Sequence, residues 1–271
     1  MLQYELGFLG AGNMAEAIAK AAIDKGVLAP SQMIAADPSP ARKDVFAKLG
    51  VAFTDSNAEL ISQSKQVMLA VKPQMFPKVV AELANHGTAD HVLLSIMAGL
   101  RVEKINALIA EAGGKAMRIV RVMPNTPVMV AQGMAGVAVG STCKAGDEEL
   151  AMKLFSAGGK AVRVEEPLID SITAVSGSGP GYIFYIAEAM EKAAAELGLG
   201  EHARLLVAQT LAGAAAMLQQ SPDTAAELRR KVTSPKGTTE AAIAHMDSKD
   251  MMQTIVEAMK AAHRRSIELG Q

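Results

Sequence analysis

The segment Val232–Glu240, which reads Val-Thr-Ser-Pro-Lys-Gly-Thr-Thr-Glu, gathers the hydroxyl groups that are best placed for chemistry. It interrupts a helical region rich in Ala, Leu and Met, and helix is expected to resume at Ala241–Ala244. Unpaired backbone N–H groups and the helix dipole make such a helix start a ready anion site. An ordinary N-cap, supported by Glu240, explains the same residues equally well. The segment alone therefore leaves its ligand open.

A second candidate site lies near the N-terminus, where Gly10–Ala15 forms a G-x-G-x-x-A pattern. The pattern follows a predicted strand and opens a predicted helix, which is the context that dinucleotide binding requires. Gly10 permits the tight turn, and Gly12 lets the backbone approach a pyrophosphate. Ala15 allows the helix to pack closely on the strand. We therefore expect NADH or NADPH as the cofactor.

The end of the second predicted strand bears on the choice between these cofactors. Asp37 stands where an acidic side chain accepts the ribose 2′-hydroxyl of NADH, whereas Ser39, Arg42 and Lys43 could hold the 2′-phosphate of NADPH. A solvated first turn of a helix explains Arg42 and Lys43 at least as well. The preference for NADH or NADPH stays open.

Three later strand ends carry turn residues, at Ala70–Pro73, Ile96–Gly99 and Met123–Pro127. An open α/β sheet places its ligand crevice at the carboxyl ends of its strands, so three such endings indicate a cofactor cleft. Lys72 either pairs with a phosphate there or is simply exposed.

Composition limits the classes of function. The 271 residues are 50% hydrophobic but only 3% aromatic, and the net charge is −1 without a block of like charges. Nucleic-acid and membrane-surface binding rely on a clustered basic face, so we expect neither partner. Cys143, the sole cysteine, excludes an internal disulfide and fits a cytoplasmic protein. No secretory signal is apparent, and the longest apolar run, Leu205–Leu218, is too short for a bilayer.

Short strand-like runs alternate with helical runs up to about Val164, and strands cease after Glu165. Such alternation predicts parallel strands with crossover helices. We therefore predict an α/β Rossmann-type parallel-sheet domain over residues 1–165, followed by an all-α substrate and dimerisation domain over residues 166–271. The expected strands are Tyr4–Leu9, Met33–Ala36, Gln66–Val71, His91–Ile96, Ala116–Val122, Gly133–Val139 and Lys160–Val164.

The helical half is too rich in Ala and Gly to bury much apolar surface by itself. Seams of small residues let backbones approach closely, and a second copy of the chain is the natural partner. We expect a homodimer formed through this half. The expected helices are Leu168–Val175, Gly179–Leu197, His202–Gln219, Thr224–Lys231, Thr238–His245 and Lys249–Leu269.

Acid–base residues are missing from the expected cleft. The five histidines are scattered, and no cluster has the spacing of a metal site, so no metal is expected. Reduction of a ketone usually needs a Lys, His or Tyr to protonate the alkoxide. An imine can arrive already protonated, so the enzyme need only hold the hydride donor and the rest of the substrate. A substrate carboxylate would suit the helix start behind Thr238 and Thr239.

The motifs in their order closely resemble those of the Δ1-pyrroline-5-carboxylate reductase family. The resemblance rests on Gly7–Ala15, Ala70–Pro73, Met123–Pro127, Ser176–Pro180 and Val232–Thr239, and it covers nearly the whole chain. It implies reduction of Δ1-pyrroline-5-carboxylate to L-proline with NADH or NADPH, the last step of proline biosynthesis. It also implies a helical half like that of 6-phosphogluconate dehydrogenase, interlocked with its twin, and often a ring of dimers.

The resemblance also assigns roles to single residues. The substrate loop would be Thr233–Thr239, with substrate contacts from Thr233, Ser234, Gly237, Thr238 and Thr239, and with Thr239 and Ser234 as the catalytic candidates. Asp37 and Asn125 are added from the strand ends. The full set of expected cofactor contacts is Gly10, Ala11, Gly12, Asn13, Met14, Asp37, Ser39, Asn57, Ala70, Val71, Lys72, Pro73, Ala98 and Asn125.

Two residues depart from the family pattern. Lys236 stands where the family usually has Gly, in a loop that must bend tightly, and Gly181 replaces the usual Ala after Ser-Gly-Ser-Gly-Pro. Neither change removes an expected contact.

Two other functions fit parts of the sequence. A β-hydroxyacid dehydrogenase would share the two-domain plan, but it would carry a Lys-x-x-x-Asn pattern that the helix from Tyr182 to Lys192 lacks. A non-catalytic dinucleotide sensor would leave the Thr233–Thr239 loop without a role.

Overall fold

A computed structural model describes residues 2–270 of the chain. Its contacts divide the chain into two compact units. Unit 1 runs to Ser178 and takes in the chain again from Ala262, and unit 2 is Gly179–Ala261. The boundary between residues 165 and 166, drawn where strands cease, stays a prediction. Residues 1 and 271, which end the two predicted domains, lie outside the described residues.

Unit 1 is built on one sheet of eight strands in the order β3-β2-β1-β4-β5-β6-β7-β8. The first six strands of this order form the doubly wound Rossmann arrangement, so the predicted fold class is confirmed. All seven predicted strands are present, with ends shifted by a few residues. The strands are β1 (Tyr4–Leu9), β2 (Met33–Ala36), β3 (Ala52–Thr54), β4 (Ser64–Leu69), β5 (Val92–Ser95), β6 (Arg118–Met123), β7 (Gly133–Val139) and β8 (Gly159–Arg163).

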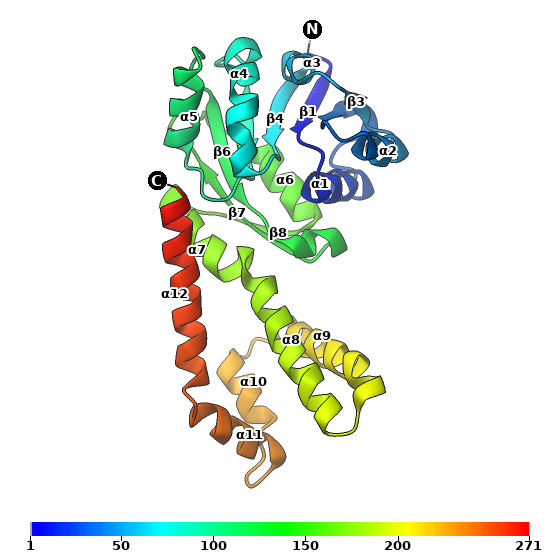
Figure 1. Ribbon diagram of the computed structural model, residues 1–271, viewed down its shortest axis with the longest axis vertical. Coiled ribbons are helices and arrows are strands. Elements are labelled where there is room, and N and C mark those ends of the chain that lie inside the picture. Colours follow the sequence, from blue (N-terminus) through cyan, green and yellow to red (C-terminus); the bar gives the residue numbers. More distant parts are fainter. Residues whose placement is uncertain (1, 271) are drawn as a thin grey trace. The chain divides into compact units, whose positions relative to one another are not determined.

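Helices cover both faces of this sheet (Figure 1). One apolar cluster contains Ile18, Phe46 and Leu154 from α1, α2 and α6, and a second contains Leu83 and Ile105 from α4 and α5. Alternate residues of the strands enter the two clusters, because successive side chains point to opposite faces. The helices of unit 1 are α1 (Asn13–Asp24), α2 (Pro40–Lys48), α3 (Asn57–Gln63), α4 (Phe76–His86), α5 (Val102–Glu111), α6 (Glu149–Ala157) and α7 (Ile169–Ile172).

One strand departs from the predicted parallel arrangement. β7 pairs with β6 in the antiparallel direction, with Met123 opposite Gly136, while β8 runs parallel to β7. The link from Met123 to Gly133 holds only the short 3-10 turn Thr126–Val130. A parallel crossover needs about a dozen residues or more, so this link can only reverse the chain.

Short 3-10 turns complete unit 1 at Pro30–Gln32, Pro73–Met75 and Glu166–Leu168. After Glu166–Leu168, α7 continues directly into a π-helical turn, Thr173–Gly177, in place of the single helix Leu168–Val175 that the sequence predicts. The N–H of Ser178 donates to the carbonyl of Thr173 at 2.8 Å, which is the i to i+5 bond of a π turn. Such turns occur frequently at functional sites.

Unit 2 consists of helices, and their surfaces are largely exposed in the single chain. None of the residues of α8, α10 and α11 is buried, and Tyr185 and Leu205 are 75% and 71% exposed. The expectation that this half buries little by itself is confirmed. Its helices are α8 (Gly179–Glu196), α9 (Ala203–Gln220), α10 (Ala225–Lys231), α11 (Thr238–Asp247) and the first part of α12 (Met251–Leu269), with a 3-10 turn at Gly200–His202. The last turns of α12, from Ala262 on, belong to unit 1.

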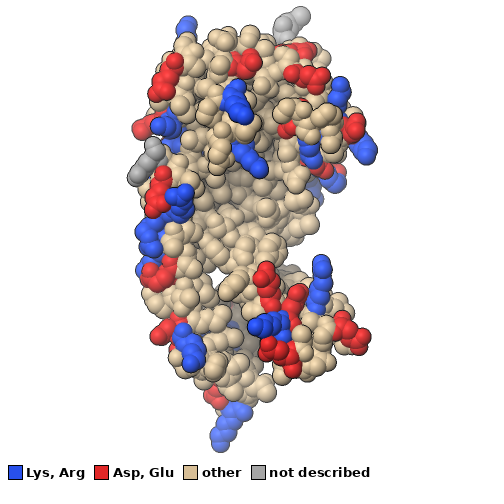
Figure 2. Space-filling model, viewed as in Figure 1, with Lys and Arg blue, Asp and Glu red and all other residues tan. Residues whose placement is uncertain are grey.

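The charged side chains on one face of the molecule are of both signs (Figure 2). On the face shown in Figure 2, Lys and Arg lie interspersed with Asp and Glu, as the net charge of −1 leads one to expect. Within the described residues, no helix is both long and apolar enough to cross a membrane.

Candidate cofactor and substrate site

The turn between β1 and α1 has the geometry that its glycines predict. Gly10 has a φ of 95°, and a Cβ there would lie 2.9 Å from the carbonyl carbon of Ala70. Gly12 precedes α1 without a side-chain cap, and a Cβ on it would meet no atom within 4 Å. The free N–H groups of the helix start therefore face open space, which suits a pyrophosphate.

A cavity of about 650 Å³ opens over this turn at the point where the strand order reverses, between β1 and β4. This is where doubly wound sheets bind dinucleotides. The lining combines glycine backbone with acidic, amide and basic side chains, a mixture that fits the ribose and phosphate groups of a nucleotide. The cavity is lined by Leu9, Gly10, Gly12, Ala36, Asp37, Pro38, Asp55, Asn57, Ala70, Val71, Lys72, Met75, Lys78 and Val79.

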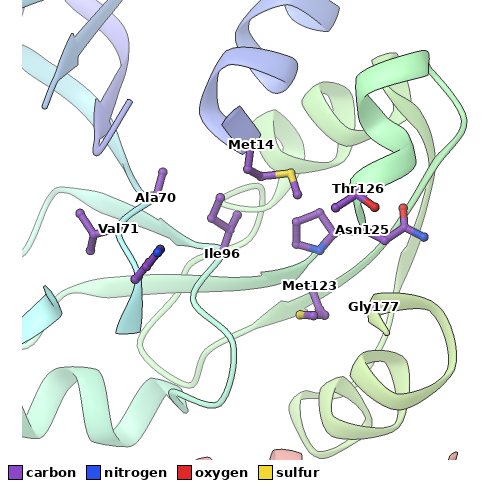
Figure 3. Close-up of a pocket in the computed structure, with 10 residues that line it drawn as sticks. Met14, Ala70, Val71, Ile96, Met123, Asn125, Thr126 and Gly177 are labelled. Atoms are coloured by element: carbon purple, nitrogen blue, oxygen red, sulfur yellow. The ribbon is translucent and has the colours of Figure 1, made fainter. Parts of the chain in front are cut away.

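A smaller cavity of about 300 Å³ shares Ala70, Val71 and Lys72 with the first. Figure 3 shows Met14 and Met123 on opposite sides of it, with Asn125 and Thr126 across from Ala70 and Val71. Its largely apolar lining suits a flat ring such as nicotinamide. The remaining lining residues are Ile96, Pro124 and Gly177.

The carboxylate of Asp37 is held by the backbone. One of its oxygens accepts the N–H of Ala11 and the other accepts the N–H of Ser39, both at 2.9 Å. Asp37 also lines the larger cavity, which leaves it beside the expected ribose position.

Arg42, in contrast, is engaged by other groups of the protein. Its guanidinium donates to the carbonyl of Ala11 and to the carboxylate of Glu16 at 2.6 Å, and its side chain is 18% exposed. These bonds direct the guanidinium toward the β1–α1 turn. They weaken the case for Arg42 as a ligand of a 2′-phosphate.

The structure brings most of the predicted cofactor residues together. Gly10, Gly12, Met14, Asp37, Asn57, Ala70, Val71, Lys72 and Asn125 line the two cavities. Ala11, Asn13, Ser39, Pro73 and Ala98 lie at the same strand ends but are not among the lining residues. The role of each residue toward a cofactor stays a prediction.

Several lining residues were missed by the sequence reasoning. Asp55 follows β3, a three-residue strand that was not predicted, and Lys78 projects from α4, where an isolated Lys carries no signal. Gly177 belongs to a motif that was noted without a role, and the structure places it in the smaller cavity. Thr126 lies within the strand end Met123–Pro127 that the sequence indicated, although no role was assigned to it.

In unit 2, the predicted substrate loop joins α10 to α11. Gly237 is the N-cap residue of α11, and no side chain caps the helix start. The alternative interpretation of this segment, an ordinary N-cap by Ser or Thr, is therefore excluded. The hydroxyl of Thr233 donates to the carbonyl of Arg229 at 2.6 Å, whereas Thr238 and Thr239 form the uncapped first turn.

Lys236 occupies a position whose backbone conformation favours glycine. It has a φ of 59° and follows Pro235 in a turn closed by the Gly237 N–H, which donates to the carbonyl of Ser234 at 3.0 Å. Proline followed by a residue with positive φ is typical of a type II turn, which favours glycine at that position. The N–H of Lys236 donates to the Glu240 carboxylate at 2.6 Å, so Glu240 supports this turn and does not cap the helix through its N-cap residue.

Gly237 is required by the same turn, because a Cβ on it would lie 2.4 Å from the Ser234 hydroxyl oxygen.

Across the described residues, no group of His, Cys, Asp and Glu has the arrangement to hold a metal ion.

Comparison with known proteins places these features in one family. Residues 166–269 match the family model described as pyrroline-5-carboxylate reductase dimerisation. Residues 5–99 match the model described as NADP oxidoreductase, coenzyme F420-dependent.

Full-length relatives support the same family. The chain is 40% identical to pyrroline-5-carboxylate reductase of Haemophilus influenzae, over 99% of this chain and 98% of that protein. The structure of a pyrroline-5-carboxylate reductase from Coxiella burnetii superposes with a TM-score of 0.89 at 37% identity, covering 99% of both chains. Pyrroline carboxylate reductase of Plasmodium falciparum, solved with NADP bound, superposes with a TM-score of 0.88 at 27% identity over 100% of both chains.

The sheet order and the cleft at its switch point define an NAD(P)-binding oxidoreductase fold with an appended helical dimerisation domain. The chain belongs to the pyrroline-5-carboxylate reductase family.

Proposed function

We propose that the protein reduces Δ1-pyrroline-5-carboxylate to L-proline with NADH or NADPH, the last step of proline biosynthesis. The observation that carries the proposal is the full-length match to pyrroline-5-carboxylate reductases of bacteria and plants, at 40% and 37% identity. Support comes from the dinucleotide cleft of unit 1 and the uncapped, hydroxyl-bearing start of α11 in unit 2.

The residues of unit 1 have the task of holding the cofactor. Gly12 and the start of α1 suit the pyrophosphate, Asp37 and Asn57 suit the adenosine side, and the smaller cavity suits the nicotinamide ring. Bound NADH or NADPH supplies the hydride. Met14 and Met123, on opposite sides of the smaller cavity, exclude water from the ring and restrict its orientation.

The loop of unit 2 has the task of holding the substrate. The free N–H groups at Thr238 and Thr239 favour its carboxylate, because the helix start carries partial positive charge. The hydroxyl of Thr239 accepts the N–H of the protonated imine, and Ser234 provides a second hydroxyl nearby in the chain. Since the imine nitrogen already carries its proton, hydride addition to the ring carbon yields the amine without a separate acid residue.

A spectrophotometric assay tests the proposal. Oxidation of NADH and NADPH is followed by absorbance with Δ1-pyrroline-5-carboxylate and, in parallel, with 2-oxo and 3-oxo acids. We expect turnover with the imine only. Turnover of an oxo acid without turnover of the imine would favour a hydroxyacid dehydrogenase, and cofactor binding without any turnover would favour a sensor.

We further propose that the working molecule is a homodimer or a ring of dimers and that it acts in the cytoplasm. The exposed apolar surface of unit 2 and the matching dimerisation model support self-association. The single cysteine, Cys143, suits a reducing compartment. Sedimentation velocity distinguishes a dimer from a larger ring by mass.

A further inference from the structure

Arg121 is a buried charge that the proposed mechanism does not use. It lies in the middle of β6 with only 1% of its surface exposed. Its two terminal nitrogens lie 3.6 Å from carboxylate oxygens of Glu166 and Asp170, respectively. Burial lowers the pKa of Arg121, and the two carboxylates oppose that shift.

Asp170 is the centre of this group. Besides its contact with Arg121, the Asp170 carboxylate accepts hydrogen bonds from the guanidinium of Arg101 at 3.2 Å and from the hydroxyl of Ser266 at 2.7 Å. Asp170 is 2% exposed. Glu166 accepts the N–H of Val102 at 2.8 Å, at the start of α5. These charged and polar contacts thus link β6, the start of α5, the segment 166–177 and the last turns of α12, all of which belong to unit 1.

Both segments that Arg121 joins continue into the smaller cavity. β6 leads to Met123, Pro124 and Asn125, and the segment from Glu166 leads through the π turn to Gly177. The side-chain amide of Asn125 donates to the carbonyl of Ser176 at 3.0 Å. A Cβ on Gly177 would lie 2.5 Å from the methyl carbon of Met123, so the two walls are in close contact.

A buried ion pair is weak evidence of added stability. Replacing a buried ion pair by apolar residues of similar volume is often neutral or stabilising, whereas a pair that stays charged can select one packing over others. The 3.6 Å separations are also longer than strong charge-assisted hydrogen bonds, which lie at about 2.7–2.9 Å.

We propose that Arg121 is a positioning residue, which fixes the segment 166–177 on β6 through Asp170 and Glu166. Gly177 and Asn125 are thereby held as one wall of the smaller cavity, the expected nicotinamide site. The inference rests on the proposed function for the identity of the ring that this wall contacts.

The test replaces the two most buried charges together with groups of similar shape, as Arg121→Met with Asp170→Asn, so that neither of these two is left without the other. Arg118→Met with Asp147→Asn is the matched control. Arg118 lies on the same strand and is joined to Asp147, which precedes α6, at 2.6 Å, and neither residue lines the smaller cavity. The affinities of each variant for NADH and for ADP-ribose, which lacks the nicotinamide, are measured alongside kcat and KM for the imine and the melting temperature.

The Arg121 and Asp170 double variant is expected to bind ADP-ribose within about twofold of the wild type, to bind NADH about tenfold more weakly and to lose kcat. Arg121→Lys, which keeps the charge, should lie closer to the wild type. An unchanged ratio of NADH to ADP-ribose affinity overturns the proposal, and so does an equal change in the Arg118 and Asp147 control. The affinity ratio decides this even if the wild type does not reduce the imine, which separates this proposal from the proposed function.

Discussion

At the scale of single residues, Thr239 offers the sharpest test of the substrate site. It lies in the uncapped first turn of α11, where its hydroxyl and N–H are available to a ligand. We expect Thr239→Ala to lower kcat/KM for the imine by about tenfold, the worth of one hydrogen bond to a charged group. The affinity for NADPH, measured by fluorescence, should be unchanged. A loss of cofactor affinity instead would make the loop part of the cofactor site.

Asp37 tests the choice of cofactor. Its carboxylate lines the larger cavity while accepting the N–H groups of Ala11 and Ser39. We expect Asp37→Ser to raise the NADPH to NADH ratio of kcat/KM by about tenfold, because a carboxylate near the ribose repels a 2′-phosphate. Steady-state kinetics with both cofactors measures the ratio.

Asp55→Ser is the matched control for Asp37, since it removes a different carboxylate from the same cavity. Its effect on the ratio should be smaller. An unchanged ratio in Asp37→Ser would mean that this carboxylate only orders the two backbone segments.

The sequence could predict a site residue where its role depends on its neighbours in the chain. Gly10 and Gly12 carry their signal in a short motif after a strand, and the geometry follows from that motif. Lys78 and Gly177 reach the cavities only through tertiary packing. Arg121 reads as one polar residue in an apolar strand, and its partners lie 45 and 49 positions further along the chain.

At the scale of elements, the loop before α11 contains a testable strain. Lys236 holds a φ of 59°, which costs a non-glycine residue about 1 kcal/mol, while glycine costs entropy of a similar size in the unfolded chain. We expect Lys236→Gly to raise the free energy of unfolding by at most about 1 kcal/mol, with a rise in melting temperature of about 2 °C. Thermal and urea unfolding measure both quantities.

Asp250→Gly is the matched control for Lys236→Gly, because Asp250 has a φ of 50° in the same unit. A similar gain at both positions would assign the effect to φ alone. Destabilisation by Lys236→Gly would show that the Lys236 side chain contributes contacts that outweigh the backbone strain.

The errors in the predicted elements have physical reasons. Ala52–Thr54 is too short for a periodic signal, and only its pairing with β2 defines it as a strand. β7 has the composition of a parallel strand, so its direction is set by the short link from Met123. Loop length was readable from the sequence, and applying the minimum length of a crossover would have predicted the reversal.

At the scale of the whole molecule, self-association is the main expectation. Leu205 on α9 is 71% exposed in the single chain, and Phe184 and Tyr185 on α8 are also exposed. We expect Leu205→Glu to shift the protein toward monomers at micromolar concentration, because burying a carboxylate in an apolar interface costs several kcal/mol. Sedimentation velocity reads out the mass.

Leu2→Glu, at a leucine of unit 1 that is 50% exposed, is the matched control and should leave the mass unchanged. A Leu205→Glu variant with the mass of the wild type would place the interface elsewhere on the helices.

The return of α12 to unit 1 has a consequence for the order of biosynthesis. Ser266 donates a hydrogen bond to Asp170, and Leu269 packs beside Gly99, so residues that follow unit 2 in the chain complete a unit whose strands all precede it. While the ribosome adds residues 179–261, the emerging Rossmann sheet lacks these last helical turns, and Asp170 lacks its hydroxyl partner. The unit whose strands leave the ribosome first thus has to wait for the last turns of α12 before its contacts are complete.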